Sequence, residues 1–388
     1  MQKSSLPRLA ILGAGPIGLE ALVYAKALGF PVTLYEASKP AAHLERWAFV
    51  KMFTPFGWNV TAAGKAVLMR EAPMRDFPAD ADLLTAREYR DTYLTPLSES
   101  FALKSLIQVD ARVLAIGRGG RFKNEPWQAK QALPPFRLLI RNGQGVERFE
   151  SADIVLDCTG VLARPNFAGD GGLPAAGELA SRPQLSYWIE DVLGTKKAHY
   201  AGRTVAVIGS GYSAAAVVCD LTQLAEEQQA TWIIWLTHGA KTAPLPRLAG
   251  DPLKERDRLA AKVNHLAARC EGNLEYHAGA VVDEIATLGP DKGFRLAARV
   301  GSTAKVWEVE RVIACVGYRA DLAIASELRV GEPNGMPETT EPGYFHLGIK
   351  AHDRDSAFLI RDGHEQIRRV FAQLAGKPAL NLYAAKAA

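Results

Sequence analysis

Two short glycine-rich segments, each directly after an apolar run, constrain this chain of 388 residues more than any other feature. Residues 13–18 read Gly-Ala-Gly-Pro-Ile-Gly and follow the apolar run Leu9–Leu12. Residues 209–214 read Gly-Ser-Gly-Tyr-Ser-Ala and follow Thr204–Ile208. A G-x-G-x-x-G turn between a buried parallel strand and a helix is typical of a dinucleotide-binding βαβ unit. The chain is therefore expected to contain two such α/β units.

The first glycine turn has the features that a dinucleotide pyrophosphate requires. Gly13 permits the tight turn, Gly15 lets a pyrophosphate approach the backbone, and Gly18 allows the helix to pack closely on the strand. The phosphates would then lie on unpaired N–H groups at the helix N-terminus. Glu36 follows Gly18 by eighteen residues, at the end of the next predicted strand, where a carboxylate can accept both ribose hydroxyls. The predicted residues of this site are Gly13, Gly15, Pro16, Ile17, Gly18 and Glu36.

The second glycine turn predicts a second nucleotide site with a different ribose preference. Ala214 stands where the third glycine would be, a substitution that the fingerprint tolerates. The next predicted strand, Trp232–Leu236, is not followed by an acid, whereas Lys241 and Arg247 come soon after it. These cations could bind a 2′-phosphate, which favours NADPH over NADH, or they could be solvated loop charges. The predicted residues of this site are Gly209, Gly211, Tyr212, Ser213, Ala214, His238, Lys241 and Arg247.

The rest of the chain suggests how the two units are connected. Residues 163–202 are rich in glycine and proline, which is typical of a crossing between domains. Two other apolar strands run into small-residue turns, Cys158-Thr159-Gly160 and Cys315-Val316-Gly317. A turn at Asn142-Gly143 between alternating strands predicts a hairpin. The last 70 or so residues, with a strand near Phe345 and a helix from about Gly363, are too short for a domain and are expected to return to the first one.

Composition and charge exclude several classes of function. The net charge of +4 arises from 46 basic and 42 acidic residues without a basic block, so nucleic acid is not an expected partner. No apolar run is long enough to span a bilayer, and the protein is expected in the cytoplasm without a membrane partner. The four cysteines form no Cys-x-x-Cys pair, and none is expected to be an exposed, reactive thiol. No His/Cys cluster has zinc spacing, so no metal site is expected.

Together, the two glycine turns and the Cys-Thr-Gly and Cys-Val-Gly turns resemble the layout of two-dinucleotide-binding-domain flavoproteins. That superfamily includes flavin-containing monooxygenases and thioredoxin-reductase-like enzymes. The resemblance implies two Rossmann-like domains, an FAD domain of residues 1–165 and 318–388 and an inserted NADPH domain of residues 166–317. It also implies that Gly160 and Gly317 lie at the crossings between them. The G-x-G-x-S-A form of the second turn is most similar to the monooxygenase branch.

The chain also departs from the patterns of this superfamily. Residues 185–200 contain no Phe-x-Gly-x-x-x-His signature of the monooxygenase branch. The superfamily's late Gly-Asp, which binds the ribityl chain of the flavin, is replaced by Gly348-Ile349, and Asp355, Asp362 or a backbone group could substitute. The resemblance implies that the helix from about Gly363 points its N-terminus toward the flavin pyrimidine, where a positive helix end stabilises reduced flavin.

The aromatic-rich segment Trp47–Trp58 is open to two interpretations. It either lines the flavin pocket, with Trp47 a candidate contact and Arg46 beside it, or belongs to the core. Catalytic side chains are not identified from sequence, although three histidines fall near the expected flavin end of the C-terminal segment: His346, His352 and His364.

The expected activity is that of an FAD-dependent NAD(P)H oxidoreductase acting on a small molecule. Reduced flavin could react with O₂ and oxygenate a nitrogen, sulfur or carbon centre, which is the favoured alternative. It could instead reduce an external disulfide or quinone, or the protein could sense redox state, although a sensor needs no hydride donor. A homodimer is left open.

Overall fold

The computed structural model describes residues 6–125, 133–355 and 357–384. The chain forms two compact units: the first unit comprises Met1–Arg164 and Tyr318–Ala388, and the second unit comprises Pro165–Gly317. Each unit contains one parallel sheet and one three-stranded antiparallel sheet. The predicted α/β class with two parallel-sheet units is therefore confirmed.

The first unit is built around a five-stranded parallel sheet of order β15-β7-β1-β2-β3. All four residues of β1 are buried, as expected for a central parallel strand covered on both faces. Leu9 pairs with Val32 of β2 on one side and with Ile154 of β7 on the other. Its strands are β1 (Leu9–Leu12), β2 (Val32–Tyr35), β3 (Ile107–Gln108), β7 (Ile154–Asp157) and β15 (Tyr344–His346).

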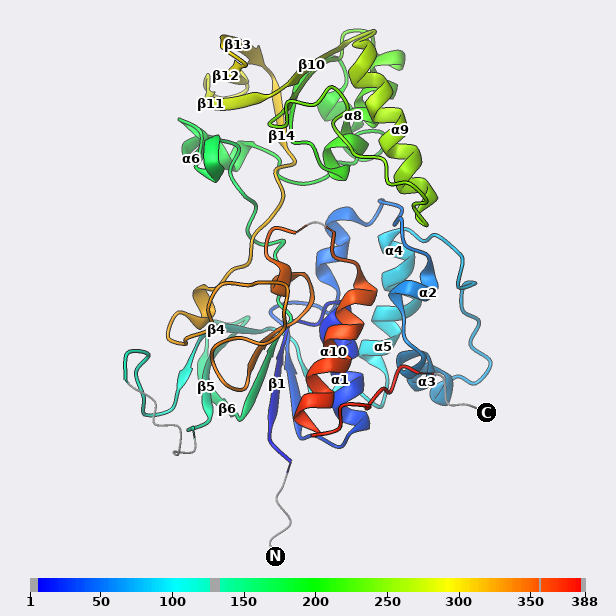
Figure 1. Cartoon of the computed structure of the whole chain (residues 1–388), viewed down its shortest axis with the longest axis vertical. Coiled ribbons are helices and arrows are strands. Elements are labelled where there is room, and N and C mark those ends of the chain that lie inside the picture. Colours follow the sequence, from blue (N-terminus) through cyan, green and yellow to red (C-terminus); the bar gives the residue numbers. More distant parts are fainter. Residues whose placement is uncertain (1–5, 126–132, 356, 385–388) are drawn as a thin grey trace, which may run out of the picture. The chain divides into compact units, whose positions relative to one another are not determined.

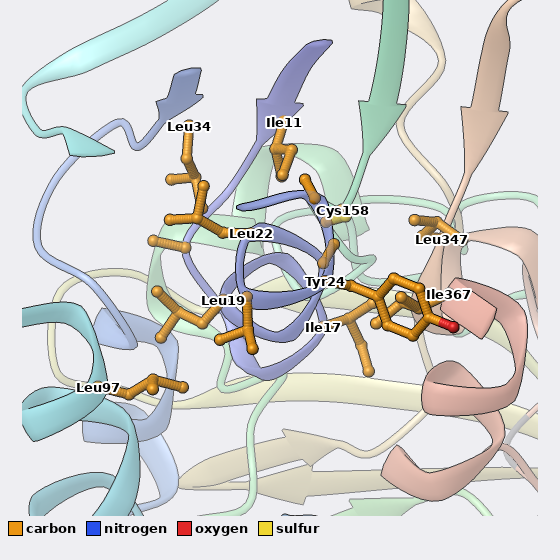
Figure 2. Close-up of a cluster of buried hydrophobic side chains, with 14 of the residues drawn as sticks. Ile11, Ile17, Leu19, Leu22, Tyr24, Leu34, Leu97, Cys158, Leu347 and Ile367 are labelled. Atoms are coloured by element: carbon orange, nitrogen blue, oxygen red, sulfur yellow. The ribbon is translucent and has the colours of Figure 1, made fainter. Parts of the chain in front are cut away.

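Two helices, α1 (Pro16–Ala27) and α10 (Ile360–Leu374), pack side by side in this unit (Figure 1). Helix α1 begins at a proline, whose fixed φ suits the first helical position. The rings of Tyr24 on α1 and Phe371 on α10 stack with centroids 5.0 Å apart. Figure 2 shows Leu22 of α1 beside Leu34 of β2, and Leu19 on the side of the helix toward Leu97. The helix thus buries one side on the sheet and another on α10.

The segment between β2 and β3 contains several short helices joined by non-helical chain. Residues 86–94 form α4 followed by the π-helical turn η2, and Pro96 lies in the first turn of the next helix, α5. Thr85 and Glu88 cap α4 reciprocally, because each side chain accepts a backbone N–H of the other. The elements here are η1 (Ala42–Trp47), α2 (Phe56–Asn59), α3 (Ala62–Glu71), α4 (Ala86–Tyr89), η2 (Arg90–Leu94), α5 (Thr95–Glu99) and η3 (Lys104–Leu106).

The antiparallel sheet of the first unit confirms the predicted hairpin. Its order is β4-β5-β6, and the turn at Asn142 joins β5 to β6. The Asn142 side-chain oxygen accepts the backbone N–H groups of Gln144 and Val146, which fixes the turn. The strands are β4 (Ala111–Arg118), β5 (Phe136–Asn142) and β6 (Glu147–Ala152).

The second unit is built around a four-stranded parallel sheet of order β10-β9-β8-β14. Helices α8 and α9 pack on each other, and a separate antiparallel sheet has the order β11-β12-β13. The apolar run Thr204–Ile208 forms a strand with those bounds, and helix α9 spans Lys254–Arg269. The main elements are β8 (Thr204–Ile208), α8 (Tyr212–Glu227), β9 (Trp232–Thr237), α9 (Lys254–Arg269), β10 (Leu274–Ala278), β11 (Ala280–Thr287), β12 (Phe294–Val300), β13 (Thr303–Val309) and β14 (Arg311–Ala314).

Short helical turns make up the remaining elements. Those of the second unit are η4 (Asp170–Gly172), α6 (Glu178–Ser181), η5 (Arg182–Gln184) and α7 (Lys197–Tyr200). Those of the first unit are η6 (Ala323–Ala325) and η7 (Gly348–His352). Within the described residues, no helix is both long and apolar enough to cross a membrane.

Candidate cofactor sites

The first glycine turn is closed on one side by the protein and open on the other. Gly13 has φ +91°, and a Cβ there would lie 2.9 Å from the carbonyl oxygen of Cys158. A Cβ on Gly18 would lie 1.9 Å from the carbonyl oxygen of Gly13, so only glycine lets α1 approach the turn. A Cβ on Gly15 would meet no protein atom within 4 Å. The open space therefore lies at Gly15, where the fingerprint requires room for a pyrophosphate.

The N-terminus of α1 is a favourable place for phosphate. Gly15 is the residue that precedes the helix, and no side-chain hydrogen bond caps it. Unpaired N–H groups in a first helical turn carry partial positive charge and bind anions. Pro16 and Ile17 lie in that turn, as predicted from the sequence. The residues present thus fit a phosphate group.

Glu36 is held rigidly at the carboxyl end of β2. Its side chain is buried, and Oε2 accepts the Ala14 N–H at 2.8 Å. Oε1 accepts the Ser38 N–H at 2.9 Å. A carboxylate has about four lone-pair positions. The Ser38 hydroxyl also donates to Oε1 at 3.3 Å, which leaves about one position, on Oε2, that can accept a ribose hydroxyl.

The second glycine turn repeats the geometry of the first. Gly209 has φ +131°, and a Cβ there would lie 2.2 Å from the carbonyl oxygen of Cys315. A Cβ on Gly211 would meet nothing within 4 Å, and Tyr212 begins α8 directly after it. The exposed Ser213 lies in the first turn of that helix, while Ala214 is fully buried against the second unit's core.

Sequence reasoning missed one residue that holds this turn, Trp235 on the neighbouring strand β9. The indole Nε1–H of Trp235 on β9 donates to the carbonyl oxygen of Gly209 at 2.8 Å, and the ring is fully buried. A tryptophan in an apolar strand gives no sign of such a bond in sequence. The bond fixes the turn from the neighbouring strand.

The cations expected to bind a 2′-phosphate have different surroundings. His238 and Lys241 are exposed after β9, and within the described ranges Lys241 forms no ion pair. Arg247 is also exposed, but its guanidinium binds Asp257 through two hydrogen bonds of 2.8 and 2.6 Å. Of these two cations, Lys241 is therefore the one without a carboxylate partner among the described residues.

The two crossing turns place a glycine in the left-handed region. Gly160 has φ +69° and Gly317 has φ +76°. The side-chain amide of Asn166 donates to the carbonyl oxygen of Val316 at 3.1 Å, next to Gly317. Gly13 packs against the first of these turns, at the carbonyl of Cys158. Gly209 packs against the second, at the carbonyl of Cys315.

Gly348 and Gly363 both pack on Ile17, next to the first glycine turn. A Cβ on Gly348, where φ is +74°, would lie 3.1 Å from Cγ1 of Ile17. A Cβ on Gly363 would lie 2.3 Å from its Cδ1. Figure 2 shows Ile17 in the same cluster as Leu347 and Ile367. The C-terminal segment is thus positioned at the first glycine turn.

The start of α10 differs from the prediction. The helix begins at Ile360 rather than near Gly363, because the Asp362 carboxylate accepts the Leu359 N–H at 2.8 Å and caps the first turn. Asp355, the other suggested replacement for the ribityl-binding acid, accepts the Ala357 N–H at 2.8 Å. Both carboxylates are used locally by the backbone.

A buried ionic cluster lies where β7 ends, and sequence reasoning missed it. The Lys350 ammonium and the Asp157 carboxylate lie 2.6 Å apart, and neither side chain is exposed to solvent. Tyr344 donates to the same carboxylate oxygen at 2.6 Å, and Lys350 also donates to the Thr159 hydroxyl at 2.9 Å. Burial acts to raise the pKa of Asp157, but the charge of Lys350 and the hydrogen bonds from Lys350 and Thr159 outweigh it and hold the pKa below its usual value.

The candidate histidines are mostly buried and uncharged. Burial lowers the pKa of His346 and of His364 to about 4. His352 lies with Nδ1 3.7 Å from the Asp355 carboxylate. Near neutral pH, His346 and His364 are therefore neutral.

The aromatic segment lies in part in the core of the first unit, one of the two interpretations open from sequence, and its contact with flavin stays a prediction. Phe56 is fully buried in the core of the first unit, and Trp47 packs against that core while half-buried. Trp58 is half-buried, and the guanidinium of Arg361, at the start of α10, lies 3.7 Å from the centre of its ring. An indole fixed beside the N-terminus of α10 is near the place where the resemblance puts the flavin.

The cysteines are free thiols in the described chain. Burial raises the pKa of Cys315 to about 12 and that of Cys219 to about 11, and it also raises the pKa of Cys158 well above its usual value. Cys270 contradicts the expectation for the set, because it is exposed at the end of α9. It has φ +48° there, and its thiol contacts the Ala267 carbonyl oxygen at 3.3 Å. Among the described residues, no group of three His, Cys, Asp or Glu side chains could hold a metal ion.

No protein-family model matches the chain, and no curated protein matches it in sequence. Solved structures do match its fold. Bacillithiol disulfide reductase Bdr (YpdA) from Bacillus cereus has a TM-score of 0.69 at 16% identity, over 96% of this chain and 99% of that chain. DfoA, the cadaverine monooxygenase from Erwinia amylovora in an FAD-bound structure, has a TM-score of 0.66 at 13% identity, over 99% and 100% of the two chains. The Kutzneria sp. 744 ornithine N-hydroxylase KtzI, solved with reduced FAD, NADP⁺ and L-ornithine, has a TM-score of 0.62 at 14% identity, over 96% and 99%.

These matches confirm the predicted resemblance at the level of fold. The chain has the architecture of the two-dinucleotide-binding flavoproteins over nearly its whole length. The matched proteins include both a disulfide reductase and monooxygenases, so the fold is shared by both reaction types.

Proposed function

We propose that this protein is an FAD-dependent NAD(P)H oxidoreductase, in which the first unit binds FAD and the second binds NADPH. The observation that carries the proposal is the repeated geometry of the two glycine turns. In each turn the first glycine packs on a backbone carbonyl, and a Cβ on the second would meet no protein atom within 4 Å. One such turn can belong to an unrelated α/β fold, but two with the same open position support two dinucleotides.

The residues of each unit favour different cofactors. In the first unit, Glu36 offers a fixed carboxylate to the ribose hydroxyls. In the second unit, the end of β9 has no acid, and the exposed Lys241 is available for a 2′-phosphate. When bound, the cofactors would supply hydride transfer and electron storage. The chain's share is to orient them, to hold their charges and to exclude water.

For the later half-reaction, we favour oxygenation of a small molecule over reduction of a disulfide. An internal dithiol relay needs a reactive thiolate, and burial raises the pKa values of Cys158, Cys219 and Cys315 far above neutrality. Cys270 is exposed but follows a separate helix. The reductase alternative, acting on an external disulfide or quinone, is supported by the fold shared with bacillithiol disulfide reductase.

The proposal is tested with the purified protein. It should retain FAD, and NADPH should bleach the flavin absorbance under argon faster than NADH does.

After O₂ is admitted, NADPH consumption, H₂O₂ release and product formation are measured with amines, thioethers and ketones, and separately with small disulfides and quinones. NADPH oxidation coupled to an oxygenated product supports the monooxygenase reaction. Stoichiometric H₂O₂ with every candidate, together with rapid disulfide or quinone reduction, would establish the reductase. Absence of FAD binding would refute the whole proposal.

A further inference from the structure

The buried Asp157–Lys350 pair calls for a functional explanation. Removing two charges from water costs several kcal/mol for each ion, and a well-packed apolar pair is often at least as stable. Here the pair lies next to Gly348-Ile349, the position at which the superfamily that the sequence resembles is expected to carry a Gly-Asp. Lys350 stands two residues after Gly348, within the same turn η7.

The pair joins two segments that both touch the first glycine turn. Asp157 ends β7, and the carbonyl of the next residue, Cys158, is the atom on which Gly13 packs. On the other side, Gly348 begins η7 and packs on Ile17 of α1. The ion pair therefore connects the two segments, the end of β7 and η7, that contact the glycine turn.

Additional hydrogen bonds make this connection rigid. Lys350 donates to the hydroxyl of Thr159, which itself donates to Asp157 at 2.7 Å. Tyr344 of β15 adds a third donor to Asp157. The Gly348 N–H donates to the side-chain oxygen of Gln366 on α10 at 2.7 Å, so η7 is held from its other side as well. With its charges paired and its acceptors satisfied, such a network specifies one arrangement of the segments around it.

We propose that Asp157 and Lys350 are positioning residues for the flavin. Their ion pair, which we call the clasp, fixes η7 to the Cys158-Thr159-Gly160 turn and so sets the positions of the two segments that contact the first glycine turn, where FAD would bind. The clasp replaces, by holding the backbone, the direct contact that a Gly-Asp sequence would make. This inference rests on the proposed binding of FAD to the first unit.

The test compares the clasp with a second buried ion pair of the same unit. In the clasp variant, Asp157→Asn with Lys350→Met, both charges are removed, while the introduced amide oxygen can still accept from Thr159 and the amide N–H can donate to the Tyr344 hydroxyl. In the matched control, Arg118→Met with Glu341→Gln, the pair removed joins β4 to the segment before β15, with a contact of 2.8 Å and side chains 7% and 10% exposed. Both variants are measured as full chains for FAD dissociation constant, thermal unfolding midpoint without FAD, NADP⁺ affinity, and circular dichroism of the flavin band at saturating FAD.

The clasp variant is expected to raise the FAD dissociation constant at least tenfold and to change the flavin dichroism, whereas NADP⁺ affinity stays within twofold of the wild type. The control should leave the flavin dichroism unchanged and the FAD dissociation constant within threefold, even where its unfolding midpoint falls. If the clasp variant binds FAD as tightly as the wild type with the same dichroism, or if the control has an equal effect on both, the clasp has no positioning role.

Two further outcomes are distinguishable. If the clasp variant does not fold, Asp157→Asn alone carries the test, because its amide oxygen can still accept from Lys350. A rise of at least threefold in the FAD dissociation constant is then expected, and an unchanged value overturns the proposal. If the wild type itself binds no FAD, both the proposed function and the clasp fail. If the wild type binds FAD and the clasp variant does so equally well, only the clasp fails.

Discussion

Glu20 should make the stability of the first unit depend on pH in a way that a single substitution abolishes. This residue lies on α1 and is fully buried. Its carboxyl group accepts hydrogen bonds from the Thr61 hydroxyl at 2.8 Å and from the Tyr93 hydroxyl. Burial raises the pKa of Glu20 from 4.5 to about 7, although both hydrogen bonds act to lower it.

The sign and size follow from proton linkage. Below pH 4.5, Glu20 is protonated in both the folded and the unfolded chain. Between pH 4.5 and about 7, the folded chain holds a proton that the unfolded chain has lost, so the free energy of unfolding falls as pH rises. Above that window the loss is constant. The difference between the two pKa values corresponds to about 3 kcal/mol.

Glu20→Gln keeps the shape of the side chain and removes its titration. The variant is expected to be close to the wild type in stability at pH 4.5 and more stable by about 3 kcal/mol at pH 8. Urea unfolding of the apoprotein between pH 4.5 and 8 measures this, using the transition that added FAD moves to higher urea, since a ligand stabilises the unit that binds it. Glu147→Gln, at an exposed position on β6, is the control and should follow the wild type. Parallel pH curves for the wild type and Glu20→Gln would refute the reasoning.

Three other predictions concern the cofactors. Gly15→Val should give a folded protein without flavin, and Gly211→Val should give a flavoprotein that NADPH no longer reduces. Each new side chain enters the open space beside its glycine turn rather than the core. Flavin content and anaerobic reduction by NADPH measure these effects, and unchanged flavin occupancy in Gly15→Val would contradict the first. Lys241→Ala should lower the catalytic efficiency with NADPH about ten- to a hundredfold and leave that with NADH unchanged, because a hydrogen bond to a charged group contributes roughly 1.5–3 kcal/mol. Arg247→Ala should have a smaller effect, because the Arg247 guanidinium is already bound to Asp257. Equal losses for the two cofactors would contradict it. The variant with all four cysteines replaced by Ser or Ala should still be reduced by NADPH and reoxidised by O₂, as stopped-flow absorbance would show, whereas loss of turnover in a folded, flavin-loaded variant would reveal a thiol step.

Much of the fold was predictable because it depends on local properties of the backbone. A position with positive φ that packs against a carbonyl requires glycine, so it appears in the sequence as part of a glycine motif. Gly13 and Gly209 were recognised for that reason. Strands buried on both faces are also evident, and β8 has the predicted bounds. The start of α10 was missed by three residues because the cap depends on the orientation of the Asp362 side chain.

What sequence could not provide were contacts between distant side chains. Asp157 and Lys350 are 193 residues apart, and nothing near either predicts a partner of opposite charge. The bond from Trp235 to Gly209 is hidden for the same reason, since an apolar strand predicts a core residue and no donor. The pairing of Arg247 with Asp257 could have been anticipated, because an acid in the first turn of a predicted helix ten residues later is a natural partner.

The way the chain passes between the two units has a consequence for protein engineering. The Arg319 N–H bonds to the Arg164 carbonyl at 3.0 Å, and the Asn166 N–H bonds to the Gly317 carbonyl at 3.0 Å. Backbone hydrogen bonds thus join the outgoing and returning segments of the chain on both sides of the boundary, and the two chain ends of each unit lie next to each other. A cut at this boundary would sever only two adjacent backbones. The second unit could therefore be exchanged as a cassette for one of another specificity, and the first could be closed by a very short linker.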